Sequence, residues 1–583
     1  MNDVVRSSRA LLGLAAVAVA FAAADTYVVV LALPDMMTSA GLDIAELQRA
    51  APIVSGFLLG YVGALPLIGR IADLRGRTPV LIGSLVVFAV GSVLTAAAYN
   101  LDTMVLGRFV QGVGGGGLVP ATLALVADLW PVERRGLPLG VVGAVQEVGS
   151  VLGPLYGAVV LAVSDWRAIF WLNCAAGLVL AAAILRLRGS RVDAPDIAAR
   201  SRSSGAQADW IGALLAVGTL ACFALVELQP QALVTDVTYG LAFVPVAGDS
   251  RWLTPIAFAA VALAALFVIR QVLARRPLLA WRAWGAVSRE ADLLGAVLLS
   301  CSLAGIILAF ASADPEQQVL SPAAPLLLVG AAVFAGLFAW RQRRAPHPLI
   351  PRATFRATPA WGALVISFFI GSALIAALVD IPFFARITVY RNSQLEAALV
   401  LLRFLVALPF GAVLGGWLTR RVSAAALTAG AMVVTALAFL QMARWEQDTL
   451  TQWTATVPLV LAGVGFGLAI APVNAAVLAH TRQDAHGVAS ALLVVARMVG
   501  MLVGISALTA VGLRRFYAAS AEIPPLEELC PGQATACEAY NSAIVDAGIA
   551  QLQAVFIGAA VCALIAAVLA AVLLRGTRVS RVE

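Results

Sequence analysis

Lysine is absent from this sequence, and charge of either sign is scarce. All 39 basic residues are arginine, and charged residues occupy 12% of the 583 positions, about half the share found in a soluble domain. Hydrophobic residues make up 61% of the chain, and no water-soluble fold could bury that much apolar surface. We therefore expect a membrane protein, and we attribute the missing lysine to the base composition of the genome.

Histidine and cysteine are also rare. The three histidines fall in predicted loops, and four of the six cysteines stand alone within apolar segments, where a thiol behaves as a small core side chain. These residues form neither a metal-ligand cluster nor a nucleophile–base pair, so we expect no enzyme, no metal and no cofactor. The net charge of +7 is spread over many short loops, which argues against a nucleic-acid partner.

The first apolar run lacks a cleavage site. Arg6 and Arg9 precede a run that continues to Pro34, which predicts an uncleaved first span. A helix that crosses a bilayer needs about 20 apolar residues. Sixteen segments meet that rule, namely 10–33, 50–68, 79–99, 103–129, 138–163, 165–185, 210–228, 255–273, 293–312, 324–340, 361–389, 397–418, 424–443, 456–479, 488–513 and 552–574. An even number places both termini on one side of the membrane.

The placement of arginine predicts which side faces the cytoplasm. Most of the 39 arginines fall on segments that are internal when both termini are cytoplasmic, for example Arg70, Arg75 and Arg77 after the second span. Cytoplasmic loops carry such an excess of positive charge. We therefore expect a multi-pass protein of the bacterial inner membrane with both termini in the cytoplasm.

Glycines of the fourth and fifth spans recur 351 positions later. Positions 112, 114, 116, 136, 149 and 153 correspond to positions 463, 465, 467, 487, 500 and 504. The first six and last six spans are therefore predicted to be copies, as in transporters whose halves rock about a central site. The expected fold is all-α, with an N-terminal half (1–190), a linker of about four helices (191–358) and a C-terminal half (359–583).

The linker contains a second repeat. Asp209-Trp-Ile-Gly-Ala-Leu-Leu recurs as Asp292-Leu-Leu-Gly-Ala-Val-Leu. One explanation is a duplicated two-helix hairpin, and the other is the general similarity of helices rich in alanine and leucine. We favour the duplication.

Three motifs follow one another on the second to fifth spans. They read Gly69-Arg-Ile-Ala-Asp73-Leu-Arg-Gly76-Arg77 after span two, Arg108-Phe-Val-Gln111-Gly112 in span four, and Gly149-Ser-Val-Leu-Gly153-Pro154-Leu-Tyr-Gly157 in span five. In this order they resemble the major facilitator superfamily, and most of all its branch of drug:proton antiporters with linker helices. The extra linker hairpin departs from that branch, which normally has fourteen spans.

Three further segments narrow the resemblance. Those that begin at Asp25, Gln146 and Val494 are similar to a subgroup of mycobacterial exporters of triacylglycerols. The resemblance implies export of lipids or lipophilic drugs, and it implies a periplasmic lipoprotein as partner. It also implies that the bend at Pro154 seals the cavity during transport, although the three span-five glycines would equally serve close helix packing.

The loop after span two is expected to form a latch. Asp73 and Arg77 lie four residues apart near a helix start on the inner side. The carboxylate could meet a helix N-terminus and an arginine such as Arg134 or Arg135. The cluster would form when the inner side closes and break when it opens. The alternative is an ordinary solvated loop.

Charges inside spans are costly and therefore mark function. Asp25 lies in the middle of the first span, and Asp380 lies in the corresponding first span of the second half. A carboxyl group that faces the central cavity could carry the coupling proton, and we expect this role for Asp25 before Asp380. A purely structural hydrogen bond is the alternative for Asp25.

A second pair of charges is expected to form a gate between the halves. With the offset of 351, the counterpart of Arg497 in the first half is Gln146. Glu147 is therefore one residue away from the counterpart of Arg497. We expect Glu147 and Arg497 to meet across the interface, with Glu147 also able to take up a proton. Arg403 is an alternative partner for Glu147, or it extends outward to the membrane surface.

The segment 514–551 is long for a connection between spans. Its prolines and its tip suggest two helices that project outward, and Cys530 and Cys537 could close a disulfide on the oxidising side. In the lipid exporters that the chain resembles, such helices are thought to pass cargo onward. A solvated loop is the alternative.

These observations predict a monomeric, proton-coupled exporter of hydrophobic or amphipathic molecules that works by alternating access. The spans consist mostly of Ala, Leu, Val, Gly and Phe, and a cavity poor in hydrogen-bonding groups suits such a cargo. The alternatives are a proton-coupled permease for a polar small molecule and a membrane scaffold that transports nothing.

Overall fold

Long helices make up most of the described structure. The computed structural model describes residues 2–42, 47–189, 209–274, 290–311, 323–390, 393–530 and 537–575, and these contain no β-strand. The first six long helices are α1 (Asn2–Ser39), α2 (Leu47–Arg75), α3 (Arg77–Ala97), α4 (Leu101–Leu129), α5 (Gly136–Val163) and α6 (Trp166–Gly189). The linker contains α7 (Trp210–Leu228), α9 (Pro255–Leu273), α11 (Leu293–Ala311) and α12 (Ala324–Arg344). The last six are α13 (Thr358–Ile387), α14 (Gln394–Leu418), α15 (Ala424–Met442), α16 (Thr456–Ala479), α17 (His486–Ala521) and α19 (Glu538–Leu573).

Fourteen of these described helices are long and apolar enough to cross a membrane. They correspond to all the predicted spans except those of α5 and α11, of which α11 has a shorter apolar stretch, Leu293–Ala309. The prediction of an all-α polytopic membrane protein is confirmed. The count of sixteen spans stays a prediction.

Glycines set the close approach of helices within each half. A Cβ atom added to Gly112 of α4 would overlap the carbonyl oxygen of Phe57 in α2, and one added to Gly463 of α16 would overlap that of Phe404 in α14. In a bilayer, where lipid competes with every apolar contact, such small residues allow the van der Waals packing that holds helices together. The same contact therefore occurs in both halves.

The two linker hairpins share one polar clip. Asp209 accepts a hydrogen bond from the backbone N–H of Gly212 at the start of α7, and its carboxylate pairs with Arg270 of α9 at 3.1 Å. The N–H of Gly212 is the main cause of a lowered pKa of Asp209, and Arg270 adds to it. In the second hairpin, Asp292 caps α11 in the same way and pairs with Arg341 of α12 at 3.0 Å. This repeated clip supports a duplicated hairpin.

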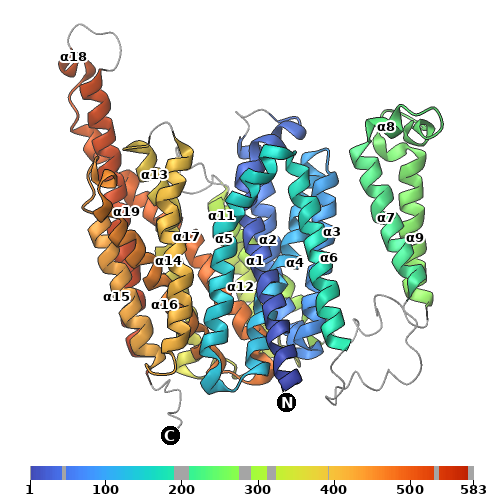
Figure 1. The fold of residues 1–583 in the computed structure, drawn as a ribbon, viewed down its shortest axis with the longest axis horizontal. Coiled ribbons are helices and arrows are strands. Elements are labelled where there is room, and N and C mark those ends of the chain that lie inside the picture. The colour runs from blue at the N-terminus through green and yellow to red at the C-terminus, as the bar shows by residue number, and fades with distance from the viewer. Residues whose placement is uncertain are drawn as a thin grey trace.

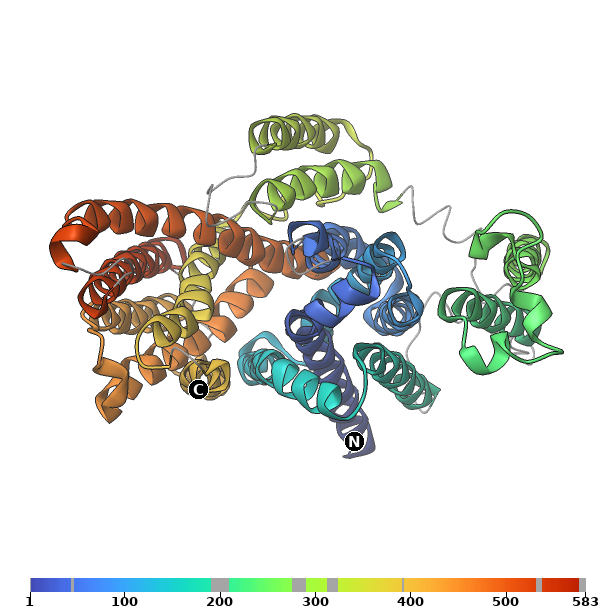
Figure 2. The ribbon, with the colours of Figure 1, turned by 90° about the horizontal axis from the view of Figure 1, so that it is seen from above.

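The hairpins occupy different places beside the two halves (Figures 1 and 2). The α7–α9 hairpin lies at the edge of the N-terminal half. There, Glu227 is buried and accepts a hydrogen bond of 3.4 Å from the backbone N–H of Tyr99, and Arg251 stacks on the ring of Tyr99 at 4.2 Å. The α11–α12 hairpin lies across both halves, because α11 contacts α2 and α17.

The helices alternate in direction, so α1 begins and α19 ends at the same face of the bundle (Figure 1). We call this the terminal face. The helices α17 and α19 each have 36 residues, or about 54 Å at 1.5 Å per residue, which is longer than a hydrocarbon core of about 30 Å requires. They extend past the opposite face toward the short helix α18 (Leu526–Leu529).

Candidate functional site: a central cavity and its charged residues

A small cavity lies between the two halves. Its volume is about 30 Å³, enough for a few water molecules at most. The N-terminal half contributes residues of α4 and α5 to its lining, and the C-terminal half contributes residues of α13, α16 and α17. The polar lining residues are Gln146, Glu147, Ser367, Asn474 and Arg497, and the other ten are apolar or glycine. The space within this lining is therefore too small for a lipid.

Glu147 and Arg497 line this cavity from opposite halves, as the sequence predicted for a gate. Each lies within electrostatic range of the other, and the hydroxyl of Tyr61 lies within range of both. Arg403, the alternative partner for Glu147, lies elsewhere: its guanidinium donates a hydrogen bond of 2.9 Å to the hydroxyl of Thr456. The structure thus brings together the first pair and not the second.

Asp25 lies at the centre of a separate buried network. Its carboxylate accepts a hydrogen bond of 2.6 Å from Arg108 of α4 and one of 3.0 Å from Gln111, and it also accepts from Asn173 of α6. The guanidinium of Arg108 lies over the ring of Phe57 at 4.3 Å and is fully buried. Both carboxylate oxygens therefore have hydrogen-bond donors while the group is ionised.

This network joins residues of two different sequence motifs and one residue outside them. Asp25 was a candidate proton carrier, whereas Arg108 and Gln111 belonged to the span-four motif. Asn173 was missed. It is a single amide within the apolar stretch Trp171-Leu-Asn-Cys, and a lone polar residue at mid-span is the one signal that could have identified it.

Asp380 of α13 is not brought into either cluster. Within the described part of the chain its carboxylate makes no hydrogen bond or ion pair, and it does not line the central cavity. Its proposed part in proton coupling stays a prediction.

The span-five glycines pack α5 against α1. A Cβ added to Gly149 would overlap the carbonyl oxygen of Ala20, and one added to Gly153 would overlap that of Ala24, next to Asp25. A Cβ added to Gly157 would instead overlap the side chain of Val28. The side chain of Pro154 lies outside the described residues, and its role as a bend stays a prediction.

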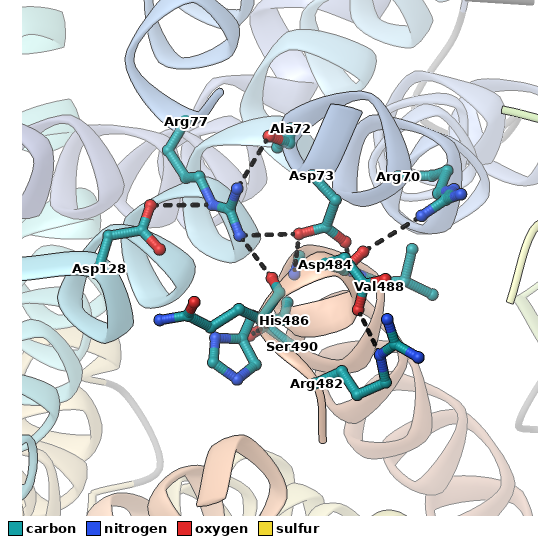
Figure 3. Close-up of polar contacts among 12 residues, drawn as sticks. Arg70, Ala72, Asp73, Arg77, Asp128, Arg482, Asp484, His486, Val488 and Ser490 are labelled. Atoms are coloured by element: carbon teal, nitrogen blue, oxygen red, sulfur yellow. Dashed lines mark hydrogen bonds and ion pairs between the residues drawn. The ribbon is translucent and has the colours of Figure 1, made fainter. Parts of the chain in front are cut away.

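The loop motif after α2 joins the two halves at the terminal face (Figure 3). The carboxylate of Asp73 accepts hydrogen bonds from the backbone N–H groups of Gly487 (2.8 Å) and Val488 (3.1 Å), in the first turn of α17. A helix N-terminus carries partial positive charge and unpaired N–H groups, so it suits a carboxylate. Gly69 allows the close approach, because a Cβ there would overlap the carbonyl oxygen of Gly487.

Arg77 completes this latch. It donates to Asp73 at 3.1 Å, pairs with Asp128 of α4 at 3.2 Å, and donates to the carbonyl oxygen of Gln483 at 2.9 Å. Gly76 precedes it with a φ of 90°, a conformation that favours glycine. Arg134 or Arg135 was expected beside Asp73; Arg135 donates hydrogen bonds to the carbonyl oxygens of Ala127 and Trp130 at the end of α4. Asp128 was missed, since nothing in its spacing links it to the motif.

Beyond the opposite face, a disulfide joins Cys530 and Cys537 between α18 and α19. This is the pairing expected from the sequence. The tip of the α17–α19 extension is therefore closed covalently.

The sequence matches a known protein family and is similar to transporters from mycobacteria. The sequence profile of the Major Facilitator Superfamily matches residues 15–342 and 293–505. A triacylglyceride transporter of Mycolicibacterium hassiacum is 35% identical over 530 residues, which cover 88% of this chain and 82% of the relative. The triacylglyceride transporter of Mycobacterium tuberculosis is 34% identical over 545 residues, covering 90% of this chain and 88% of the relative.

Two solved structures share the fold at low sequence identity. The proton:xylose symporter XylE superimposes with a TM-score of 0.53 at 11% identity, covering 97% of this chain and 95% of the symporter. The human organic anion transporter TETRAN gives a TM-score of 0.52 at 14% identity, covering 97% and 99%. The membership predicted from the three motifs is confirmed, whereas a place in the drug:proton antiporter branch stays a prediction. The chain belongs to the Major Facilitator Superfamily.

Proposed function

We propose that this protein is a proton-coupled secondary active exporter of hydrophobic lipids, with triacylglycerols as the first candidate cargo. The observation that carries the proposal is the identity of 35% with a triacylglyceride transporter across 88% of the chain. The mostly apolar lining of the central cavity agrees with it, because a polar substrate would need more hydrogen-bonding groups. The protein moves its cargo without changing it chemically, and lipophilic drugs are a second cargo class.

The terminal face is proposed to be cytoplasmic. The arginines of the latch and of the ends of α12 and α14 lie at this face, as the positive-inside rule requires. The disulfide at the far tip belongs to an oxidising compartment. The protein would then be a monomer of the bacterial inner membrane with both termini inside, and its α17–α19 extension would meet a periplasmic lipoprotein.

Transport is proposed to proceed by alternating access between two halves, 1–190 and 359–583, joined by the linker 191–358. Because Asp73 holds the first turn of α17, the described conformation is closed at the cytoplasmic side. Protonation of Glu147 would remove its attraction to Arg497 and allow the halves to part. At Asp25, a proton could take the place of Arg108, so that this carboxyl group stays neutral while the guanidinium turns to the cavity.

Transport into liposomes tests this function. The purified protein is reconstituted in proteoliposomes with a fluorescent triacylglycerol, and a pH gradient is imposed. We expect gradient-dependent movement of the lipid, which a protonophore abolishes. A polar permease would instead move a labelled sugar or amino acid, and a scaffold would move neither. Either outcome would contradict the proposal.

A further inference from the structure

Two seams join the halves, and the internal repeat relates them. One seam is formed by α2 and α17, and the other by α14 and α5. At the first, Gly69 faces the carbonyl oxygen of Gly487, and at the second, Gly416 faces that of Gly136. These matched contacts make α5 equivalent to α17, and α2 equivalent to α14 with an offset of 347.

A linker helix covers the α2–α17 seam, whereas the equivalent position of the α5–α14 seam is exposed. Gly63 of α2 is covered by α11, where the hydroxyl of Ser300 donates a hydrogen bond of 2.6 Å to the Gly63 carbonyl oxygen. The offset of 347 makes Phe410 of α14 its counterpart, and Phe410 is 71% exposed. A glycine thus admits a covering helix at one seam, whereas a large apolar side chain faces outward at the other.

The covering helix contacts both halves. Because α11 packs against α2 and also against α17, it lies along the seam between them, and α12 packs on α11. Figure 2 shows this hairpin on one side of the molecule, with α5 and α14 on the other side. Ser300 is eight residues from the capping Asp292, about 12 Å along the helix, so the cover lies in the half of the membrane next to the terminal face.

The other seam carries an open apolar groove of about 770 Å³. Every lining residue is apolar, including Leu137, Ala144 and Leu152 of α5 and Leu405, Phe410 and Trp417 of α14. Leu137 lies in the first turn of α5 and Trp417 in the last turn of α14, so the groove reaches the terminal face. Its volume lies within the range of about 300–1,000 Å³ that is usual for small-molecule sites. Only α5 separates it from the cavity, because Val148 lines the groove and Glu147 the cavity.

We propose that the α11–α12 hairpin is a permanent lipid seal over the α2–α17 seam, so that cargo lipid approaches from one side only, acyl chain first, through the α5–α14 groove. The inference rests on the proposed lipid transport. The groove faces the bilayer, and an acyl chain of a neutral lipid from the adjacent leaflet matches its fully apolar lining. The repeat would otherwise offer two equivalent entrances, and the hairpin removes one.

A disulfide tests whether the seal stays in place. A Cβ added to Gly63 would lie 3.6 Å from the Cβ of Ser300, within the range of about 3.5–4.5 Å for a disulfide. The double variant Gly63→Cys, Ser300→Cys is made with the four free cysteines replaced by alanine, and each single variant serves as control. We expect the oxidised protein to move triacylglycerol at the rate of the reduced protein, within about twofold. Loss of transport on oxidation in the double variant alone would show that the hairpin moves and would overturn the proposal.

Photolabelling tests the one-sided entrance without requiring transport. A triacylglycerol with a diazirine in one acyl chain is incorporated into nanodiscs, and the adducts are mapped by mass spectrometry. We expect labelling of 137–152 and 405–417 to exceed that of the α2–α17 seam by at least about fivefold. Ser300→Phe should push α11 away and expose α2 to label, whereas Ser300→Ala should not. Equal labelling of both seams in the unmodified protein would end the proposal, even in a protein that transports lipid.

Discussion

Asp73 and Gly487 are joined across the two halves by a hydrogen bond of 2.8 Å from the backbone N–H of Gly487 to the carboxylate. The Asp73 side chain is completely buried, so its charge is balanced by the first turn of α17 and by Arg77. A charge-assisted hydrogen bond in such a place is stronger than a neutral one. The contact exists only while the terminal face is closed, and it therefore favours that state.

Removing this charge should shift the protein toward the open state. Asp73→Asn keeps the shape but loses the attraction to Arg77 and to the helix N-terminus. Breaking a buried pair costs about 3–5 kcal/mol, and we expect a large rise in the open population. Spin labels on α2 and α17 at the terminal face would report the distance change. The matched control is Asp128→Asn, because that side chain is 37% exposed and such pairs contribute about 0–1 kcal/mol. An equal shift in both variants would contradict the assignment.

The Asp25 network should make single and double substitutions behave differently. Asp25→Asn leaves the buried guanidinium of Arg108 without a counter-charge, which costs about 3–5 kcal/mol and should lower the melting temperature in detergent. Adding Arg108→Gln removes the unbalanced charge and should restore most of that stability. The double variant should still fail in gradient-driven lipid export. Full export by a folded double variant would exclude Asp25 as the coupling group.

Glu147 and Arg497 should be energetically coupled. Glu147→Gln and Arg497→Ala are combined in a double-mutant cycle on export, and we expect an interaction energy of about 0.5–3 kcal/mol. The control cycle pairs Glu147→Gln with Arg403→Ala. Because Arg403 is bonded to Thr456, these two changes should add within about 0.5 kcal/mol. Additivity in the first cycle, or coupling in the second, would reverse the choice of partner.

Gly149 should tolerate no side chain. Gly149→Ala places a methyl group against the carbonyl oxygen of Ala20, and such overpacking costs about 1–3 kcal/mol. We expect a lower melting temperature and looser α1–α5 packing. Gly83→Ala is the control, since no atom lies within 4 Å of a Cβ added there, and alanine favours a helix by about 0.5–1 kcal/mol. Similar melting temperatures for the two variants would argue against a tight α1–α5 contact.

The clip of the first hairpin should depend on pH. Hydrogen bonding lowers the pKa of Asp209, so the clip stabilises the hairpin at neutral pH. This contribution is lost as the pH falls below the ordinary value of about 3.9 and through the lowered pKa. Hydrogen exchange of 210–228 should therefore speed up only in strong acid. Asp209→Ala should show the fast exchange already at neutral pH, and unchanged exchange in that variant would contradict the role of the clip.

Apolar runs predicted where the helices cross the bilayer but not where they end. The last predicted span begins at 552, whereas α19 begins at Glu538, because the helix continues beyond the lipid with polar residues. The span-counting rule responds to hydrocarbon thickness and not to helix length. The α17–α19 extension was recognised from its prolines and cysteines, which are local signals.

Contacts between helices that are far apart in the sequence were harder to predict than the spans. The glycine repeat predicted the symmetry of the halves with an offset of 351, but the helices α2 and α14 correspond with an offset of 347, which their contacts with neighbouring helices show. The pairing of Asp25 with Arg108 spans 83 residues, and no spacing rule links them. Glu147 and Arg497 were placed together because the repeat itself predicts equivalent depths.

If lipid enters only through the α5–α14 groove, the side of the protein that carries this groove is the only side from which lipid is supplied. Neighbouring proteins that crowd this side would slow the supply of lipid, whereas neighbours on the α11–α12 side would have no such effect. The rate of transport by each copy would then depend on its orientation relative to neighbouring proteins. A small apolar compound bound beside Phe410 would act as an inhibitor without entering the central cavity.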